Sequence, residues 1–175
     1  MHGIATALPH TNIPQSVAVK MLKSSSASKS LSTNFIREAL RLHELDHDNV
    51  IRLLAVCTRV EPYMLVLEYM SNGDLKSLLR TAHTLNTPLT LTHLMKFLSD
   101  VSAGFAYLQQ KQFIHRDLAT RNVLVSGSFD AKIGDFGMAK RLYRSEYYSA
   151  AGANDLEGSL ALPLRCAYAI LIQSA

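Results

Sequence analysis

Four short patterns in this sequence contain side chains that can bind phosphate oxygens or a divalent metal ion. Lys20 ends the apolar run Val17-Ala18-Val19-Lys20, and Glu38 lies in the next segment with helical spacing. An ion pair with a helical glutamate would hold a strand lysine where its ammonium group can ligate phosphate. We therefore expect Glu38 to hold Lys20 in place.

The other two patterns supply oxygen ligands. Residues 115–122 read His-Arg-Asp-Leu-Ala-Thr-Arg-Asn, so the carboxylate of Asp117 and the amide of Asn122 lie five positions apart. Asp135 opens the triplet Asp-Phe-Gly, 18 positions after Asp117. Because carboxylate and amide oxygens are suitable hard ligands for Mg²⁺, these patterns indicate a magnesium site.

The first part of the chain is expected to be rich in strands. Its serine-rich segment, Ser24–Ser32, favours a flexible loop because serine competes for backbone hydrogen bonds and offers no core. Apolar and β-branched runs predict strands, and apolar residues at helical spacing predict one amphipathic helix. The expected elements are a strand over Val17–Leu22, a helix that begins at Thr33 or Asn34 and includes Leu45, and strands over Val50–Cys57 and Tyr63–Tyr69.

The second part of the chain is expected to be mainly helical. The turn-forming cluster Ser71-Asn72-Gly73-Asp74 suits a hinge, and apolar residues alternately four and three apart then predict a helix over Leu94–Leu108, capped by Thr90 or Thr92. Three short runs predict small strands at residues 113–114, 123–125 and 131–133. The fold class is therefore α+β, with a small β-rich lobe followed by a mainly helical one.

Composition limits the classes of protein and partner. The chain has 175 residues, of which 48% are hydrophobic, and a net charge of +4. This composition favours a folded domain with a core, and the small, dispersed basic surplus argues against a nucleic-acid partner. Cys57 and Cys166 lie far apart and favour reduced thiols. We expect neither a signal peptide nor a membrane span in this chain.

The four patterns, taken in order, closely resemble the signature set of the protein-kinase family. The resemblance implies a two-lobed kinase fold that uses ATP and Mg²⁺. It implies that Asp117 orients and deprotonates the substrate hydroxyl, and that Asn122 and Asp135 bind Mg²⁺. Lys20, held by Glu38, would contact the α and β phosphates. The implied parts are a partial N-lobe over residues 1–70, a partial C-lobe over 71–148 and a divergent segment over 149–175.

The resemblance also implies an adenine site where the two lobes join. The backbone of Glu68 and Met70 would bond adenine, and Asp74 would reach the ribose. Ala18 and Leu124 would lie on either side of the adenine ring, with Leu67 as the gatekeeper. These roles follow from the resemblance and not from periodicity.

The phosphate acceptor is expected to be tyrosine. Ala119-Thr120-Arg121 is similar to the tyrosine-kinase form, in which Arg121 supplies positive charge near the transferred phosphate. Tyr143, Tyr147 and Tyr148 resemble the activation loop of insulin-receptor-like receptor tyrosine kinases. Phosphate on them would pair with arginines such as Arg116. The alternative is that the three tyrosines merely occupy an exposed loop.

One motif competes with this interpretation. His43-Glu44-Leu45-Asp46-His47 matches H-E-x-x-H, in which two histidines one helical turn apart bind zinc beside a glutamate base. Glu61 or Glu68 would be a third ligand. Asp46 between the histidines, and Val50 and Leu53 where a longer zinc motif needs glycine and histidine, argue against it.

The resemblance is incomplete at both ends of the chain. Gly3 is the only glycine before Lys20, where kinases have a glycine-rich loop, and no A-P-E follows Leu162-Pro163-Leu164-Arg165. We therefore expect a receptor kinase domain truncated at both ends, from the cytoplasmic side of the plasma membrane, that by itself transfers little phosphate. Its partners would be tyrosine-containing proteins and a second kinase in a dimer. The alternative is a kinase-like binding or regulatory module.

Overall fold

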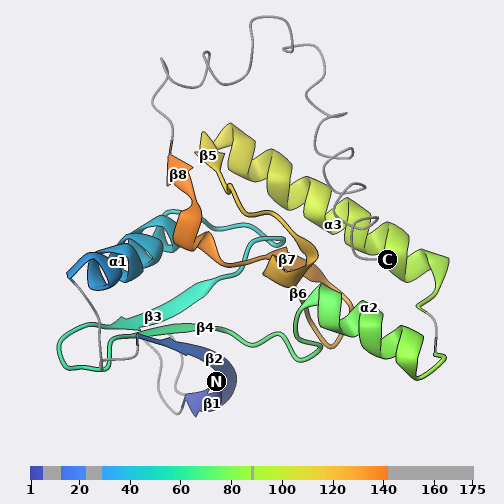
Figure 1. Ribbon diagram of the computed structural model, residues 1–175, viewed down its shortest axis with the longest axis horizontal. Helices are drawn as coiled ribbons and strands as arrows, with labels where there is room; N and C mark the ends of the chain where they lie inside the picture. The colour runs from blue at the N-terminus through green and yellow to red at the C-terminus, as the bar shows by residue number, and fades with distance from the viewer. Residues whose placement is uncertain (6–12, 23–28, 88, 142–175) are drawn as a thin grey trace, which may run out of the picture.

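The first lobe is an antiparallel sheet covered by one helix. The computed structural model describes residues 1–5, 13–22, 29–87 and 89–141 (Figure 1). Four strands lie in the order β1-β2-β4-β3. Phe35 and Ala39 of the helix pack on Leu65 of the sheet. The elements are β1 (His2–Ala5), β2 (Gln15–Met21), α1 (Lys29–His43), β3 (Leu53–Cys57) and β4 (Met64–Glu68).

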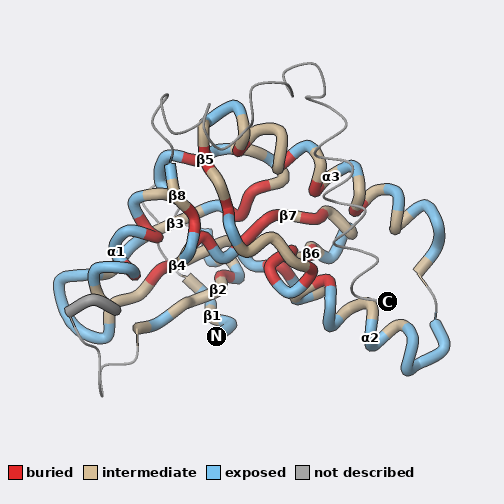
Figure 2. Tube along the Cα trace, turned by 45° about the horizontal axis from the view of Figure 1, so that its top comes forward, coloured by how far each residue is buried: buried red, intermediate tan, exposed pale blue. Residues whose placement is uncertain are grey.

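The second lobe is built from two helices and a short hairpin. The hairpin strands pair in register from Val123↔Ile133 to Val125↔Ala131, and their buried side chains pack against Phe97 and Val101 of the longer helix. Figure 2 shows this burial concentrated around β6 and β7. The elements are α2 (Leu75–Thr84), α3 (Leu91–Gln110), β5 (Phe113–Ile114), β6 (Val123–Val125), β7 (Ala131–Ile133) and β8 (Lys140–Arg141), with 3-10 helices η2 (Thr120–Asn122) and η3 (Phe136–Met138).

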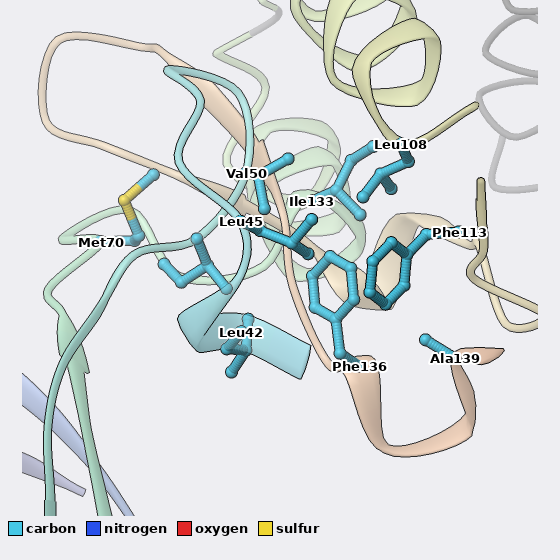
Figure 3. Close-up of a cluster of buried hydrophobic side chains, with 10 residues drawn as sticks. Leu42, Leu45, Val50, Met70, Leu108, Phe113, Ile133, Phe136 and Ala139 are labelled. Carbon is cyan, nitrogen blue, oxygen red and sulfur yellow. The ribbon is translucent and has the colours of Figure 1, made fainter. Parts of the chain in front are cut away.

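A third cluster of buried side chains joins the two lobes. It brings Leu42 of α1 and Leu108 at the end of α3 together with Phe136 of η3 (Figure 3). The chain between α1 and β3 enters this junction, because Ile51 N–H donates to the Ile133 carbonyl at 2.9 Å. A Cβ at Gly104 would lie 2.6 Å from the Asn49 carbonyl oxygen, so glycine permits this close approach of α3. The position of α1 is thus tied to the second lobe.

The expected α+β architecture is present, but several element boundaries differ. Helix α1 begins at Lys29, so Thr33 and Asn34 lie inside it and residues 29–32 of the expected serine-rich loop are helical; residues 23–28 lie outside the described part. The helix ends at His43, before Leu45. Strand β3 begins at Leu53 and not Val50, because residues 50 and 51 pair with β7 instead.

The second lobe contains one α-helix that the sequence analysis did not predict. Asp74 caps α2 by accepting a hydrogen bond from Ser77 N–H at 2.9 Å, so the turn-forming cluster ends in a helix start. The longer helix is confirmed, with Thr90 as its N-cap. The three predicted small strands are also confirmed, whereas β8, the partner of β5, was missed.

A cluster of charges fastens the β6–β7 turn to α3. Lys96 forms ion pairs with Asp100 and Asp130, each at 2.8 Å. The Ser126 and Ser128 hydroxyls also donate to Asp130. Hydrogen bonds from Lys96 and Ser128 lower the pKa of Asp130 to about 2. The carboxylate of Asp130 is therefore better stabilised in the folded chain than in the unfolded one.

We predict that Asp130→Asn destabilises the protein at neutral pH and that this loss shrinks in acid. Between about pH 4 and pH 2 the unfolded chain binds a proton that the folded chain does not, so the stabilisation falls with pH in that window. Because the side chain is 45% exposed, screening limits the loss to less than about 1 kcal/mol. Denaturant unfolding at about pH 6 and pH 3 measures it, with the exposed Asp48→Asn as control. An equal loss at both pH values would contradict the prediction.

Candidate active site

The lysine on β2 and the glutamate on α1 form the expected ion pair. Lys20 Nζ lies 2.7 Å and 2.9 Å from the two carboxylate oxygens of Glu38, which is buried, and 3.1 Å from Asp135 Oδ1. Burial alone would lower the pKa of Lys20, but the carboxylates of Glu38 and Asp135 outweigh it and raise that pKa above its usual value. The ammonium group is thus a fixed cation between two carboxylates.

The aspartate of the second pattern is held at both of its carboxylate oxygens. Arg121 forms an ion pair with Asp117 Oδ1, and Asn122 Nδ2 donates to Asp117 Oδ2 at 2.9 Å. Arg121 and Asn122 are consecutive residues of the 3-10 helix η2, and both contact the Asp117 carboxylate. The Asp117 side chain is 29% exposed, so it is oriented by these donors and still accessible. A carboxylate held in this way can accept a proton from a hydroxyl group.

Asp135 and Asn122, the two expected metal ligands, lie on adjoining segments. Gly134 N–H donates to the Asn122 carbonyl at 2.8 Å. Asp135 has a left-handed backbone with φ of 57° and directs its carboxylate to Lys20. Burial alone would raise the pKa of Asp135, but Lys20 outweighs it and lowers that pKa below its usual value. An ionised carboxylate and an amide oxygen on neighbouring segments fit Mg²⁺.

His115 connects the two loops that carry these groups, a role that sequence reasoning missed. The Asp117 N–H donates to His115 Nδ1 at 3.3 Å, so Nε2 carries the proton and donates to the Gly134 carbonyl at 2.9 Å. Burial lowers the pKa of His115, which favours this neutral ring. Its position two residues before Asp117 was the only signal in the sequence, because its acceptor is a backbone carbonyl.

The expected adenine residues lie on both sides of the connection between the lobes. Ala18 pairs with Leu67 in the β2–β4 ladder, and Leu124 of β6 forms a bridge with Asp74. The Met70 side chain belongs to the core that joins the lobes, and its carbonyl accepts a hydrogen bond from the Gly73 N–H at 3.1 Å, so a contact with adenine is expected from its N–H. The Asp74 carboxylate caps α2, so the ribose contact expected of it would compete with this cap.

The side chain of Glu68 forms a tether that the sequence did not reveal. It accepts hydrogen bonds from Lys132 Nζ on β7 at 2.8 Å and from the Arg52 N–H at 2.7 Å. Arg52 in turn pairs with Asp46 at 2.7 Å. The end of β4 is therefore bound to β7 through one carboxylate.

The zinc motif does not adopt the geometry that zinc proteases require. Helix α1 ends at His43, so His43 and His47 are not one helical turn apart on a helix. Glu44 pairs with Arg141 at 3.0 Å, and the His47 ring stacks on Tyr107 at 4.7 Å and accepts a hydrogen bond at Nδ1 from the Asn49 N–H. Within the described residues, no group of three or more His, Cys, Asp or Glu side chains could hold a metal ion. The helical placement that was expected for this motif is wrong.

Other predicted positions fall outside the described residues. These are Tyr143, Tyr147, Tyr148, Cys166 and the whole of 149–175. Arg116, the expected phosphate partner, is described and has a left-handed backbone with φ of 67°. No helix in the described part of the chain is long and apolar enough to cross a membrane.

Comparison with known proteins found similar tyrosine kinases. The chain is 42% identical over 149 residues to discoidin domain-containing receptor tyrosine kinase B of Caenorhabditis elegans, covering 85% of this chain and 17% of that protein. It is 38% identical over 156 residues to the leukocyte tyrosine kinase receptor of Mus musculus, covering 86% of this chain and 18% of that protein. It is 44% identical over 144 residues to the proto-oncogene tyrosine-protein kinase ROS of Rattus norvegicus, covering 78% of this chain and 6% of that protein.

Two of these relatives are named as receptor tyrosine kinases and the third as a tyrosine-protein kinase, and the chain spans less than a fifth of the length of each of the three. The model of the family described as protein tyrosine and serine/threonine kinase matches residues 1–159. That match covers most of the chain and contains every one of the four patterns. The chain therefore belongs to the protein tyrosine and serine/threonine kinase family.

Proposed function

We propose that this chain is part of the cytoplasmic kinase domain of a receptor and that this domain transfers the γ-phosphate of ATP to tyrosine hydroxyls of proteins. The observation that carries the proposal is the joint placement of Lys20, Glu38 and Asp135 in one ion-pair group. Asp117 is held ready by Arg121 and Asn122 on the adjoining loop. The receptor relatives support the cellular setting.

Each residue has a separate role in the proposed reaction. Asp117 accepts the proton of the tyrosine hydroxyl as that oxygen forms a bond to the γ-phosphorus and the bond from phosphorus to the leaving oxygen of ADP breaks. Arg121 offsets negative charge near the transferred phosphoryl group. Lys20 contacts the α and β phosphates. Asn122 and Asp135 would hold Mg²⁺, which neutralises charge on the phosphates when bound.

The nucleotide is proposed to bind between a partial N-lobe, residues 1–70, and a partial C-lobe, residues 71–148. The backbone groups of Glu68 and Met70 would bond adenine between the apolar side chains of Ala18 and Leu124. The stretch from the end of β4 at Glu68 to the start of α2 at Leu75 connects the lobes, which supports this division. Phosphorylation of Tyr143, Tyr147 and Tyr148 is proposed to order the loop that carries them, because the phosphates would pair with arginines such as Arg116.

An acceptor assay tests this function. The complete protein that carries these residues is incubated with γ-labelled ATP, Mg²⁺ and a peptide with one tyrosine, beside matched peptides with serine or phenylalanine at that position. We expect label on the tyrosine peptide alone, and its loss when a chelator removes Mg²⁺ and its return when Mg²⁺ is added back. Equal transfer to serine would contradict the tyrosine assignment.

A nucleotide-binding titration separates catalysis from the alternative of a kinase-like binding module. Titration with and without Mg²⁺ is run on the complete protein and on the 175-residue chain. We expect Mg²⁺ to tighten nucleotide binding wherever Asp135 and Asn122 act as ligands. Nucleotide binding by the complete protein with no transfer to any peptide would overturn the enzyme proposal in favour of the binding module.

A further inference from the structure

An arginine on α1 contacts the backbone of the segment that follows Asp135. Arg41 Nη1 donates to the carbonyl oxygens of Phe136 at 3.0 Å and Gly137 at 3.1 Å, in a partly buried setting. Glu38 precedes Arg41 by three residues on the same helix, so both side chains lie on one face of α1. The face of α1 that binds Lys20 through Glu38 therefore also contacts the backbone at the start of η3 through Arg41.

These contacts close a ring through three elements of the active site. Lys20 on β2 pairs with Glu38 on α1 and with Asp135. The chain continues from Asp135 to the Phe136 and Gly137 carbonyls, and Arg41 leads from them back to α1. A shift of α1 that breaks the Arg41 contacts would change the geometry of both ion pairs, because each is one link of the same ring.

Arg41 is partly buried and lies near other charged side chains. Burial lowers the pKa of Arg41, and the nearby cations Arg37 and Arg116 lower it further, while Glu38 acts in the opposite direction. Arginine remains protonated in proteins, so two carbonyl acceptors compensate the desolvated guanidinium.

We propose that Arg41 is a positioning residue that holds the Asp135–Gly137 backbone against α1, so that Lys20 and Asp135 face the nucleotide together. The expected effect on activity rests on the proposed kinase function. The expected effect on the position of the Asp135–Gly137 backbone does not depend on that function. The planar guanidinium directs two N–H groups from one nitrogen to two carbonyls, a geometry that a lysine ammonium reproduces incompletely.

The test compares Arg41→Met and Arg41→Lys with the control Arg37→Met in the complete protein. Arg37 lies on the same helix, carries the same charge and is exposed, with a 3.5 Å contact to Asn34. The primary measurement is hydrogen exchange of the amides of residues 135–139 without nucleotide. We expect exchange at least about 10-fold faster in Arg41→Met, intermediate exchange in Arg41→Lys, and no change in Arg37→Met.

Kinetics supply the second measurement. We expect kcat/KM for ATP to fall by about 10-fold in Arg41→Met, with KM for the tyrosine peptide unchanged and partial rescue in Arg41→Lys. Exchange at 135–139 that matches the control would overturn the proposal. Exchange that accelerates equally in α3 would also overturn it, because it would show general loss of stability. If wild-type protein transfers no phosphate, the kinase function fails, and the exchange result still decides the role of Arg41.

Discussion

Replacing Asp117 with asparagine is expected to lower the kcat for phosphate transfer to a tyrosine peptide by about 10³-fold, the range in which loss of a general base falls. Asparagine has nearly the same shape but cannot take the proton of the attacking hydroxyl. Asp117 also accepts from donors at both carboxylate oxygens, Arg121 at one and Asn122 at the other. The amide NH₂ of asparagine would face one of these donors, so orientation is lost as well.

Nucleotide binding separates this effect from misfolding. We expect the dissociation constant for ATP to change by less than about 3-fold in Asp117→Asn, because Lys20, which is proposed to contact the phosphates, and Asp135, which is proposed to hold Mg²⁺, are untouched. Asp48→Asn, which alters an exposed aspartate, is the matched control and should retain full activity. Retention of more than about a tenth of wild-type kcat in Asp117→Asn would contradict the role of Asp117 as base.

The ion pair between Lys20 and Glu38 was predicted from the sequence. Lys20 and Glu38 lie 18 positions apart, and their residue types and expected elements were enough to predict the pair that the structure contains at 2.7 Å. The roles of these and the other site residues remain proposals. Periodicity likewise predicted α3, because its buried side chains recur at helical spacing along 20 residues.

The contacts that were missed involve backbone acceptors or distant elements. Arg41 donates to carbonyls 95 and 96 positions away, and every residue carries a carbonyl, so its partners leave no trace in residue type. His115 was missed for the same reason. Helix α2 was missed because Asp74 was interpreted as part of a hinge, whereas turn-forming residues are also the usual helix caps.

The strands that differ from expectation show how tertiary pairing overrides local pattern. Val50 and Ile51 precede β3 in the sequence, and their residue types favour a strand. In the structure they pair with β7 of the other lobe, so β3 begins only at Leu53. The same contact brings Asn49 against Gly104, which is how the loop after α1 is fixed to α3.

The largest loss of stability is expected from Phe136→Ala. Phe136 is fully buried and belongs to the cluster that joins α1 to the second lobe (Figure 3). Its ring meets the His115 ring edge-on at 5.0 Å between centroids. Removing a buried phenyl ring typically costs about 3–5 kcal/mol through lost burial and the cavity that remains. Denaturant unfolding measures this loss.

Two further variants make the Phe136 result specific. Met138 lies in the same 3-10 helix but is 61% exposed, so Met138→Ala should cost less than about 0.5 kcal/mol. Phe136→Leu, which fills much of the space, should cost about 1–1.5 kcal/mol and gives a folded protein if the alanine variant does not fold. If Phe136→Ala and Met138→Ala unfold at the same denaturant concentration, the cluster around Phe136 does not hold the lobes together. A loss confined to Phe136→Ala would instead mean that the residue beside Asp135, the proposed Mg²⁺ ligand, also anchors α1, so that stability and site geometry depend on one ring.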